Sequence, residues 1–495
     1  MIRHLIYFLA FNIVFGLSIY AQPKGYDPNR LFSVEEAQED IAVLQNLLYT
    51  YHPSVFRYTP KDSIDFFFRQ IMPREAVTER QLRAKIRHVV SKIRCGHTNV
   101  LPSNHFIQYF TKNPQHHLPI EVHLINGKLF ISNNLSQDTS LHIGEELLSV
   151  ENHTANEIVQ KIYDVEISDA FSYAGKQTAV NDGFRFFNTL FYGTKPMYEV
   201  SVQDSTGKQR KLMLWEKSLD SLAKPAMDSL KNFTTNAINP LLHSPKWLLN
   251  EPSQRLRIDE KYPNLAILQI EGFDNQKFSK FYKNVFQLLQ NHQITHLVID
   301  LRNNGGGKVQ DANELLTYLL PQPFTYHFER KHQSLKGLRK YATQGRFWLR
   351  ITPSFFRCFS KTTKEADMIF HEWYHEPKTA LQFKGKVFVL TNGGTFSAAA
   401  TVAAYLKNLS NSTVIGTETG GSEAGTNALL FPLITLPHSK IQVRMPLYYV
   451  KYAIGIPDNR RGVLPHIAIQ YTLQAILLKK DLEMEEVYRQ IEKTK

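Results

Sequence analysis

The sequence predicts an α/β protein whose core is a parallel β-sheet covered by helices. Three observations predict this class. Helix signals fill residues 30–100, hairpin signals dominate residues 115–215, and strand and helix patterns alternate across residues 255–475. Alternation of this kind is typical of parallel sheets, because each pair of parallel strands needs a crossover between them. We therefore expect an N-terminal helical domain, a β-rich module and an α/β core, in that order.

The first 21 residues have the pattern of a secretory signal peptide. Arg3 precedes an apolar run that ends at Ala21, and the polar Gln22 comes next. A basic start, a short apolar stretch and a small residue before a polar one are the marks of a cleavable signal. We expect residues 1–21 to be removed and the mature protein to be periplasmic, secreted or at the cell surface. The alternative is an uncleaved anchor, although the run is short for a span of about 20 residues.

No second apolar run long enough for a membrane span follows in the sequence. A single helix that crosses a bilayer needs about 20 predominantly apolar residues. We therefore expect no stable membrane span after the signal is cleaved.

Residues 30–100 carry helix-start signals and amphipathic spacing. Ser33 and Glu36 form an S-x-x-E capping box, in which two side chains satisfy free backbone groups at a helix start. The apolar residues that follow recur at helical spacing: Ile41, Leu44, Leu47 and Leu48. Prolines in YHPSVFRYTP end this helix, and further helices are expected across SIDFFFRQIM and QLRAKIRHVVSKI.

Residues 115–215 have the pattern of a compact β-rich module. The stretch LPIEVHLINGKLFISNN contains two alternating strands joined by Asn-Gly, which is the strongest short-range hairpin signal. A strand, a turn and a helix are expected across IGEELLSVENHTANEIVQKIY. Strands are then expected to continue to about residue 215.

The α/β core, residues 255–475, shows the clearest alternation. Strands are expected at NLAILQIEGF, THLVIDL, KVFVL and STVIGT, and helices at FSKFYKNVFQLLQ, DANELLTYLL and ATVAAYLKNL. Between these elements, residues 322–382 are aromatic and basic with no clean period. We expect this segment to be an insertion that covers a site.

The composition excludes several classes of function. The formal net charge is +13, but the lysines and arginines are scattered along the chain, so we expect a solvated basic surface and no nucleic-acid binding. Cys95 and Cys358 are too few to form a metal cluster, and so large a core does not need a disulfide between them. The histidines lack H-E-x-x-H or similar spacing, so we expect no metal and no cofactor.

A lone serine stands at the entrance of an alanine-rich helix in VFVLTNGGTFSAAATVAAYL. A buried strand, a glycine turn and a helix would expose the hydroxyl of Ser397 beside the free backbone N–H of Ala398. A nucleophile next to such a donor suits acyl transfer, in which an oxyanion develops. The alternative is that Ser397 is only the N-cap of the helix.

The stretch LVIDLRNNGGGKV, residues 297–309, ends a strand with polar residues and three glycines. Glycines allow the backbone to approach a ligand closely. A phosphate loop is one interpretation, but no GK[ST] follows and Gln310 occupies the last glycine position of G-x-G-x-x-G. We favour a second oxyanion donor, the N–H of Gly306, and a tight structural turn is the alternative.

His97 in KIRCGHTNV and Asp458 in PDNRRGVLPHI complete the set of candidates. An imidazole titrates near neutral pH and is the natural general base for a serine. A carboxylate can orient that imidazole as the third member of a triad. Taken singly, His97 has the features of a structural histidine and Asp458 those of a turn residue.

Together and in this order, these stretches resemble the C-terminal processing (tail-specific) family of serine peptidases and the tricorn protease core. LVIDLRNNGGG resembles the family's strand and N-N-x-G-G turn, and VLTNGGTFSAAA resembles its nucleophile turn, with Ser397 on the nucleophile position. GTETGG, CGHTNV and GVLPHI resemble further family segments. The resemblance covers about residues 30 to 470. It implies a ClpP/crotonase-like parallel-sheet core and a PDZ-like module at residues 115–215.

The sequence departs from the tail-specific pattern at the lysine base. Ser422 stands at the corresponding position, so the resemblance implies the tricorn-like branch, which uses a histidine base and a late acidic residue. His97 would be that base. Asp458 is the best-placed acid, and Glu418 is its rival and a possible supporting residue.

These inferences predict an exported serine endopeptidase that acts on a polypeptide substrate through an acyl-enzyme. Ser397 would attack the carbonyl, His97 would transfer the proton, and Asp458 would orient the imidazole. The N–H groups of Gly306 and Ala398 would bind the oxyanion. Two alternatives stay open: a catalytically silent protein that binds a peptide or another ligand on the same fold, and a crotonase-like acyl-transfer or lyase enzyme.

Overall fold

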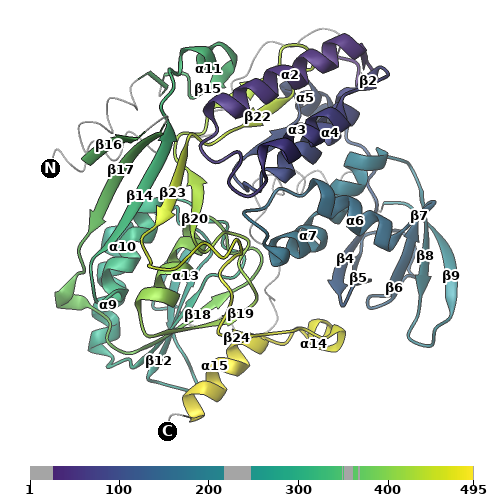
Figure 1. The fold of residues 1–495 in the computed structure, drawn as a ribbon. Coiled ribbons are helices and arrows are strands. Elements are labelled where there is room, and N and C mark those ends of the chain that lie inside the picture. The colour runs from purple at the N-terminus through teal and green to yellow at the C-terminus, as the bar shows by residue number, and fades with distance from the viewer. Residues whose placement is uncertain (1–25, 217–246, 348, 351–360, 366–367, 494–495) are drawn as a thin grey trace.

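The computed structural model describes residues 26–216, 247–347, 349–350, 361–365 and 368–493. The expected signal peptide, residues 1–21, and Cys358 lie outside these ranges. The described chain forms an N-terminal helical layer, a β-rich module and a larger α/β core (Figure 1). None of the described helices is long and apolar enough to cross a membrane. Within the same ranges, no group of three or more histidine, cysteine, aspartate or glutamate side chains could hold a metal ion.

The N-terminal layer consists of helices that local capping residues start. The Ser33 hydroxyl accepts a hydrogen bond from the N–H of Glu36, and the Glu36 carboxylate accepts one from the N–H of Ser33, which confirms the capping box. Thr78 and Gln81 form the same reciprocal pair before α4. The elements are β1 Leu31–Phe32, α2 Val34–Tyr51, α3 Lys61–Ile71, β2 Val77–Thr78, α4 Glu79–Lys92, β3 Asn99–Leu101 and α5 Asn104–Lys112.

The buried faces of this layer join the core of the central sheet. Ile41 and Leu44 of α2 are fully buried and belong to the same hydrophobic cluster as Leu268 and Ile299 of the central sheet. Strand β3 leaves the helices and pairs with β22, Gln442–Arg444, in a sheet of the core. The N-terminal layer is therefore continuous with the core.

The β-rich module folds around a separate hydrophobic cluster, which includes Val122 and Val200. Its sheet has the order β4-β5-β6-β8-β9, with β7 paired to β6. The expected hairpin is confirmed, because Asn126 and Gly127 have φ values of 50° and 80° between β4 and β5. The elements are β4 Ile120–Ile125, β5 Lys128–Asn134, β6 Glu146–Val150, β7 His153–Thr154, α6 Ala155–Val165, α7 Tyr173–Tyr192, β8 Tyr198–Gln203 and β9 Gln209–Leu214.

Helix α7 departs from the strand-rich pattern expected for this module. It packs along β4, where Gln177 donates to the carbonyl of Leu124 and Asn181 accepts from the N–H of Leu124 (Figure 1). Asn, Asp and Gly residues in its middle weaken the local helical pattern. Burial of residues such as Val180 stabilises the helix, so tertiary packing outweighs local propensity at this position.

The central sheet confirms the expected alternation. Its order is β10-β11-β12-β13-β18-β19-β24, and the strands from β12 onward run parallel. Because parallel strands end at one edge, the loops after β13 and β18 meet there. The elements are β10 Leu249–Glu251, β11 Gln254–Ile258, β12 Leu265–Ile270, α9 Phe278–Asn291, β13 His296–Asp300, α10 Val309–Leu319, β18 Lys386–Thr391, α13 Ala398–Leu409, β19 Ser412–Gly416 and β24 Ile467–Ala468.

Residues 322–382, expected as an insertion without a clean period, supply strands to a second sheet of the core. Strand β14, Phe324–Lys331, alternates buried and half-buried residues along its whole length and lies between β17 and β23. The second sheet has the order β16-β17-β14-β23-β20. The described part of this segment is therefore part of the folded core, because its aromatic side chains are buried at alternate positions of β14.

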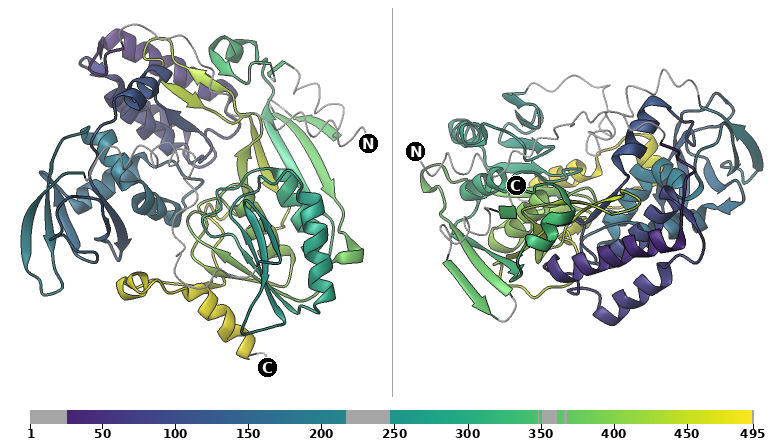
Figure 2. Two further views of the ribbon diagram at one scale, coloured as in Figure 1. Left: turned by 180° about the vertical axis from the view of Figure 1, so that it is seen from behind. Right: turned by 90° about the horizontal axis from the view of Figure 1, so that it is seen from above.

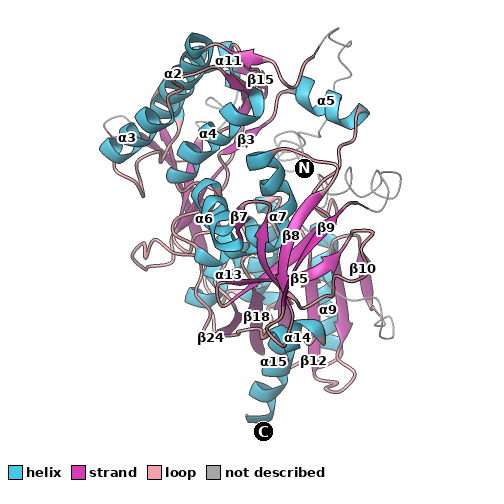
Figure 3. Ribbon diagram, turned by 90° about the vertical axis from the view of Figure 1, so that its right-hand side faces the viewer, coloured by secondary structure: helices cyan, strands magenta, loops and turns pink. Residues whose placement is uncertain are grey.

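The remaining elements complete the core. A third sheet has the order β15-β21-β22-β3 and joins the core to the N-terminal layer, whose helices lie at the top of Figure 3 together with strands β15 and β3. The C-terminal helices, yellow in Figure 2, lie at the opposite end of the core. The elements are α11 Lys336–Tyr341, β15 Ala342–Gln344, β16 Lys361–Glu365, β17 Met368–His375, η1 Thr379–Leu381, β20 Gly425–Ala428, β21 Leu433–Thr435, β23 Tyr448–Tyr452, α14 Leu473–Leu477 and α15 Leu482–Lys493.

Candidate active site

Ser397 stands on a strained turn between strand β18 and helix α13. Its backbone has φ 51° and ψ −123°, a conformation that residues with a side chain rarely adopt. Its side chain makes no capping hydrogen bond to the helix. The alternative that Ser397 is only an N-cap is therefore wrong, and its hydroxyl is available to another group.

The polar residues that follow β13 hold this turn in place. The carbonyl of Asn304 accepts a hydrogen bond from the N–H of Phe396 at 2.9 Å. The side chains of Asn303 and Asn392 are joined by a bond of 2.8 Å between Nδ2 of Asn392 and Oδ1 of Asn303. The N–H of Asn303 also donates to Oδ1 of Asn392 at 2.9 Å. The two asparagines of the R-N-N-G-G-G stretch thus support the serine turn.

Gly306 touches the serine turn from the other side. With φ at 101°, a Cβ there would lie 2.6 Å from Cβ of Ser397 and 2.9 Å from N of Ala398, so only glycine fits. The N–H of Gly306, however, donates to Oδ1 of Asn304 at 2.8 Å. The prediction that Gly306 offers an oxyanion donor is therefore wrong for this conformation. Ala398 is the first residue of α13, and its N–H has no partner within the helix.

His97 reaches Ser397 from the end of the N-terminal layer. Its Nε2 lies 3.0 Å from Oγ of Ser397. Its ring is stacked between Phe396 and Phe431, at centroid distances of 4.7 Å and 5.6 Å, and only 6% of the residue is exposed. The pairing of β3 with β22 carries this segment to the core. A Cβ on Gly96 would lie 2.5 Å from the Phe396 ring, so a glycine there is needed for the close approach.

The other ring nitrogen of His97 faces a hydroxyl and, beyond it, a buried carboxylate. Nδ1 lies 3.3 Å from Oγ1 of Thr426, and this hydroxyl donates to Oδ2 of Asp169 at 3.1 Å. Oδ1 of Asp169 accepts from the N–H of Gly96 at 2.7 Å. Because the Thr426 proton goes to Asp169, the hydroxyl accepts the proton of Nδ1–H. The lone pair of Nε2 then faces Ser397.

Burial shifts the pKa values of His97 and Asp169, the two titratable groups that the Thr426 hydroxyl joins. Desolvation, together with the charge of Arg444, lowers the pKa of His97 to about 3. Desolvation raises the pKa of Asp169 to about 6, although hydrogen bonds from Gly96 and Thr426 oppose the rise. At neutral pH the imidazole is therefore in the form that accepts a proton, and Asp169 carries a negative charge.

Asp458 does not reach His97. Its carboxylate accepts a hydrogen bond from the N–H of Arg460 at 2.8 Å and lies 3.8 Å from the guanidinium of Arg57. It therefore stabilises the exposed turn before β24. The prediction that Asp458 orients His97 is wrong, because Thr426 and Asp169 fill the space beside Nδ1.

Glu418, the rival acid, also points away from His97. Its carboxylate accepts from the Arg461 guanidinium at 2.7 Å and 2.9 Å, and from the N–H of Gly462 at 2.9 Å. It also accepts from the N–H of Tyr173 at 3.2 Å. Because Tyr173 follows Asp169 closely in the chain, Glu418 supports the site only through the backbone that carries Asp169.

Ser422 occupies the position where tail-specific proteases carry a lysine. Its hydroxyl accepts from the N–H of Ala424 at 3.3 Å and lies 3.5 Å from the Tyr58 hydroxyl. The backbone N–H of Ser422 also favours the charged form of Asp169 and so opposes the rise of its pKa. The segment therefore contributes to the acid side of the site and holds no base.

Sequence reasoning missed Asp169 and Thr426. Asp169 lies in EISDAFSYAG between two helices, where an acidic residue has the pattern of an ordinary turn. Thr426 lies on the short strand β20, and a threonine in a strand carries no chemical signal of its own. The two residues are 257 positions apart, so only the folded chain reveals their contact.

The α/β core matches a known family of peptidases. The model of peptidase family S41 matches residues 264–469, which include the glycine turn at Gly306 and the serine turn at Ser397. The α/β core is therefore similar to peptidase family S41. This chain is therefore a serine peptidase, in agreement with the resemblance of its motifs. A search of curated protein sequences finds no match.

Solved structures extend the likeness beyond the core. The structure of mature CPAF complexed with lactacystin matches with a TM-score of 0.62 and 14% identity, over 93% of this chain and 98% of that chain. The crystal structure of mature CPAF matches with a TM-score of 0.59 and 15% identity, over 90% of this chain and 94% of that chain. At these identities the likeness concerns the fold, and it agrees with the predicted α/β class.

Proposed function

We propose that this chain is an exported serine endopeptidase that cleaves polypeptides through an acyl-enzyme on Ser397. The observation that carries the proposal is the 3.0 Å contact between Nε2 of His97 and Oγ of Ser397. A nucleophile and a base at hydrogen-bond distance, with the base oriented by further groups, are the signature of covalent acyl transfer. Thr426 and Asp169 supply that orientation from the opposite side of the ring.

Acylation follows from the geometry of these groups. As Oγ of Ser397 attacks the carbonyl carbon, Nε2 of His97 takes the hydroxyl proton. The oxyanion of the tetrahedral intermediate forms beside the N–H of Ala398, at the positive end of helix α13. A single donor of this kind contributes about 3 kcal/mol to catalysis. His97 then gives its proton to the leaving amine as the C–N bond breaks.

Deacylation repeats these steps with water as the nucleophile. His97 takes a proton from the water that attacks the acyl carbon, and returns a proton to Oγ of Ser397 as the ester breaks. In both half-reactions an imidazolium forms in a buried site. The carboxylate of Asp169, acting through the Thr426 hydroxyl, stabilises that charge.

An active-serine phosphonate probe tests the nucleophile. We expect the wild-type protein to be labelled at Ser397 and to hydrolyse an unfolded protein such as casein. The Ser397→Ala variant should lose both properties with its unfolding transition unchanged. Ser205, on an exposed turn far from the site in sequence, offers the control substitution Ser205→Ala. Absence of labelling and of hydrolysis in the wild-type protein would support the alternative of a silent binding protein.

The proposed export rests on residues 1–21, whose charge and apolar pattern is that of a cleavable signal. We expect the full chain, expressed in a bacterial host with a periplasm, to be recovered outside the cytoplasm with Gln22 as its first residue. N-terminal sequencing of the fractionated protein measures this. Retention of an intact Met1 in the membrane fraction would instead support the uncleaved anchor.

A further inference from the structure

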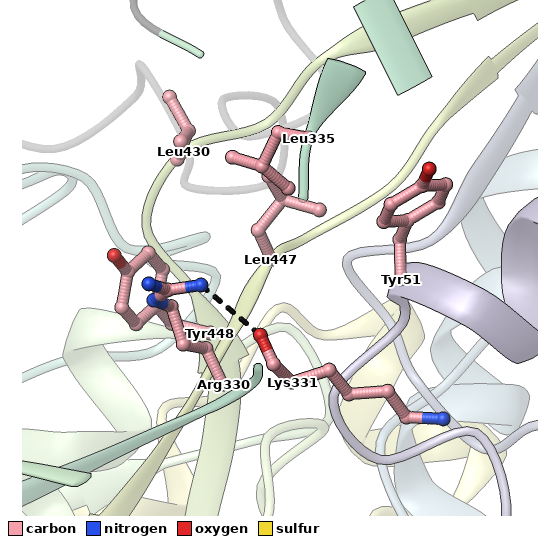
Figure 4. Close-up of a pocket in the computed structure, with 7 residues that line it drawn as sticks. All are labelled: Tyr51, Arg330, Lys331, Leu335, Leu430, Leu447 and Tyr448. Carbon is pink, nitrogen blue, oxygen red and sulfur yellow. Dashed lines mark hydrogen bonds between the residues drawn. The ribbon is translucent and has the colours of Figure 1, made fainter. Parts of the chain in front are cut away.

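A small hollow lies outside the proposed catalytic groups, where the N-terminal layer meets the second sheet (Figure 4). Tyr51 at the end of α2 borders one side, and Arg330 of β14 and Tyr448 of β23 border another. Leu430 and Leu447 supply apolar walls. The hollow therefore combines an apolar lining with one guanidinium.

The guanidinium of Arg330 has no counterion among the described residues. The residue is only 9% exposed, and its Nη1 donates to the adjacent backbone carbonyl of Lys331 at 3.0 Å. Its Nε is buried without a hydrogen-bond partner, and no described carboxylate forms an ion pair with it. A buried charge without a partner is costly, so a site of this kind favours an anion.

The charged groups around Arg330 do not compensate it. Glu329, the neighbouring acid, is engaged 3.3 Å from Arg57. The ammonium of Lys331 adds a second positive charge and donates to the carbonyl of Tyr49 at 2.6 Å. Burial and the charge of Arg330 lower the pKa of His371 to about 4, so this imidazole is neutral at physiological pH. The charges around the hollow are therefore positive, and they favour a negatively charged ligand.

One strained segment separates the hollow from the imidazole of His97. Leu430 borders the hollow, and the next residue, Phe431, stacks on His97 at 5.6 Å. Leu429 and Leu430 have φ values of 52° and 50°, and each such residue with a branched side chain costs about 1–2 kcal/mol. Strain of this kind persists where surrounding structure enforces it, often at ligand sites. Leu430 and Phe431 therefore connect the lining of the hollow to the imidazole that faces Ser397.

We propose that Arg330 is a specificity-determining residue that binds a carboxylate of the substrate in this hollow. The proposal rests on the proposed function, because it takes a polypeptide as the ligand. The carboxylate belongs to an Asp or Glu side chain or to the chain end, since both offer the same planar pair of oxygens to a guanidinium. The leucine walls accommodate the adjoining methylene groups.

Four random decapeptide libraries test the proposal by their rate of cleavage. The first library contains Asp and Glu and has a free C-terminus, and the second has a free C-terminus but no Asp or Glu. The third contains Asp and Glu and has an amidated C-terminus. The fourth has an amidated C-terminus and no Asp or Glu, so it carries neither kind of carboxylate. We expect the wild-type protein to cleave at least one carboxylate-bearing library about tenfold or more faster than the fourth, as charge-assisted hydrogen bonds allow. The second and third libraries identify the source of the carboxylate. Equal rates on all four libraries would overturn the proposal.

Substitutions assign the preference to the hollow. Arg330→Met should remove the preference for carboxylates, measured as the ratio of the cleavage rates on the first and fourth libraries. Arg346→Met, at an exposed arginine outside the hollow, should leave the preference intact. Leu447→Phe fills the hollow and keeps Arg330, so it should also remove the preference. This variant provides the test if Arg330→Met fails to fold. A preference that persists in both hollow variants would overturn the proposal.

Binding to Ser397→Ala separates this inference from the proposed function. Fluorescent versions of the first and fourth libraries should bind this variant with affinities that differ by about tenfold or more. That difference should disappear in the double variant with Arg330→Met. If the libraries bind in this way without being cleaved by wild-type protein, the hollow stands and the proposed catalysis fails. If they are cleaved through Ser397 without a binding difference, the hollow fails and the catalysis stands.

Discussion

At the scale of single residues, the acid side of the site depends on Asp169, a carboxylate that is only 2% exposed and whose pKa is raised to about 6 by burial. His97 is already neutral well below that pH, because its pKa is lowered to about 3. The ionisation of Asp169 therefore governs how well the site stabilises an imidazolium. As pH rises, His97 therefore loses its proton first and Asp169 loses its proton last.

The first prediction concerns the pH dependence of catalysis. We expect kcat/KM to rise to a plateau above about pH 6, as Asp169 loses its proton. Asp169→Asn should lower kcat by at least about tenfold and abolish this acid limb, since the amide cannot ionise. Rates measured across the pH range with each protein check both effects. An unchanged acid limb in the variant would assign the limb to another group.

The same residue makes a prediction about stability. The folded state raises the pKa of Asp169 from 3.8 to about 6, so it binds more protons than the unfolded state between these pH values. The contribution of Asp169 to the free energy of unfolding therefore falls as pH rises through this window, by up to about 3 kcal/mol.

Urea denaturation of the wild type and of Asp169→Asn at pH values below and above the window measures this contribution as a difference between the two proteins. His97 acts in the opposite sense, because its pKa is lowered, but it is common to both. The wild type should lose stability relative to the variant as pH rises. A difference that does not change with pH would show that Asp169 does not titrate in this range.

Thr426 allows a test of the hydroxyl that joins His97 to Asp169. Thr426→Val keeps the shape and removes the hydroxyl, so the Nδ1–H loses its acceptor and the carboxylate loses a donor. We expect kcat to fall about tenfold or more, as removal of a buried hydrogen-bond partner costs about 1–3 kcal/mol. Thr426→Ser restores the hydroxyl and should recover most of the rate. Equal activity of Thr426→Val and Thr426→Ser would contradict a role for the Thr426 hydroxyl between His97 and Asp169.

At the scale of elements, the site forms where strand ends meet. The loops after β13 and β18 adjoin because these strands are parallel neighbours. The pairing of β3 with β22 brings His97 from the N-terminal layer. These contacts explain how the histidine motif, the glycine turn and the serine turn, which lie far apart in the sequence, come together in the folded chain.

Gly306 and Gly127 form a matched pair for testing that close approach. Both have positive φ, 101° and 80°, but a Cβ on Gly306 would lie 2.6 Å from Cβ of Ser397, whereas a Cβ on Gly127 would meet nothing within 4 Å. Gly127→Ala should cost about 1–2 kcal/mol of stability and leave kcat unchanged. Gly306→Ala should lose a similar amount of stability because of its backbone conformation. It should also displace the serine turn and so reduce kcat by about 100-fold or more. Similar kcat values for the two variants would contradict this account.

The same scale shows what sequence can predict. The strands and helices of the central sheet have strong periods and local caps, so their existence and order follow from the chain itself. Ser397 and His97 could be proposed because their motifs together resemble those of a known family, although each taken singly has a structural alternative. Asp169 could not be predicted, because its role comes from burial between distant segments. Strand β14 has an alternating period, but its mixture of aromatic and charged residues obscures it.

At the scale of the whole molecule, the chain has hydrophobic clusters that divide it differently from its sequence patterns. The N-terminal layer and the central sheet share one cluster, whereas the β-rich module has another. Since His97 arrives from the layer and Ser397 from the core, the shared cluster keeps the two together. The shared cluster therefore holds the nucleophile and the base together, whereas α6 and α7 of the module flank Asp169 and hold the acid side of the site.

Leu44 and Leu129 test this division with the same chemical change. Leu44 of α2 is 0% exposed in the shared cluster, and Leu129 of β5 is 1% exposed in the module's cluster. Each Leu→Ala change should cost about 2–5 kcal/mol. We expect thermal unfolding in two steps, with Leu44→Ala lowering the temperature of the step that abolishes peptidase activity. Leu129→Ala should lower the temperature of a step that reduces kcat, because α6 and α7 of the module flank Asp169. Calorimetry with parallel activity measurements checks this, and a single transition shifted equally by both changes would mean that the two clusters unfold as one.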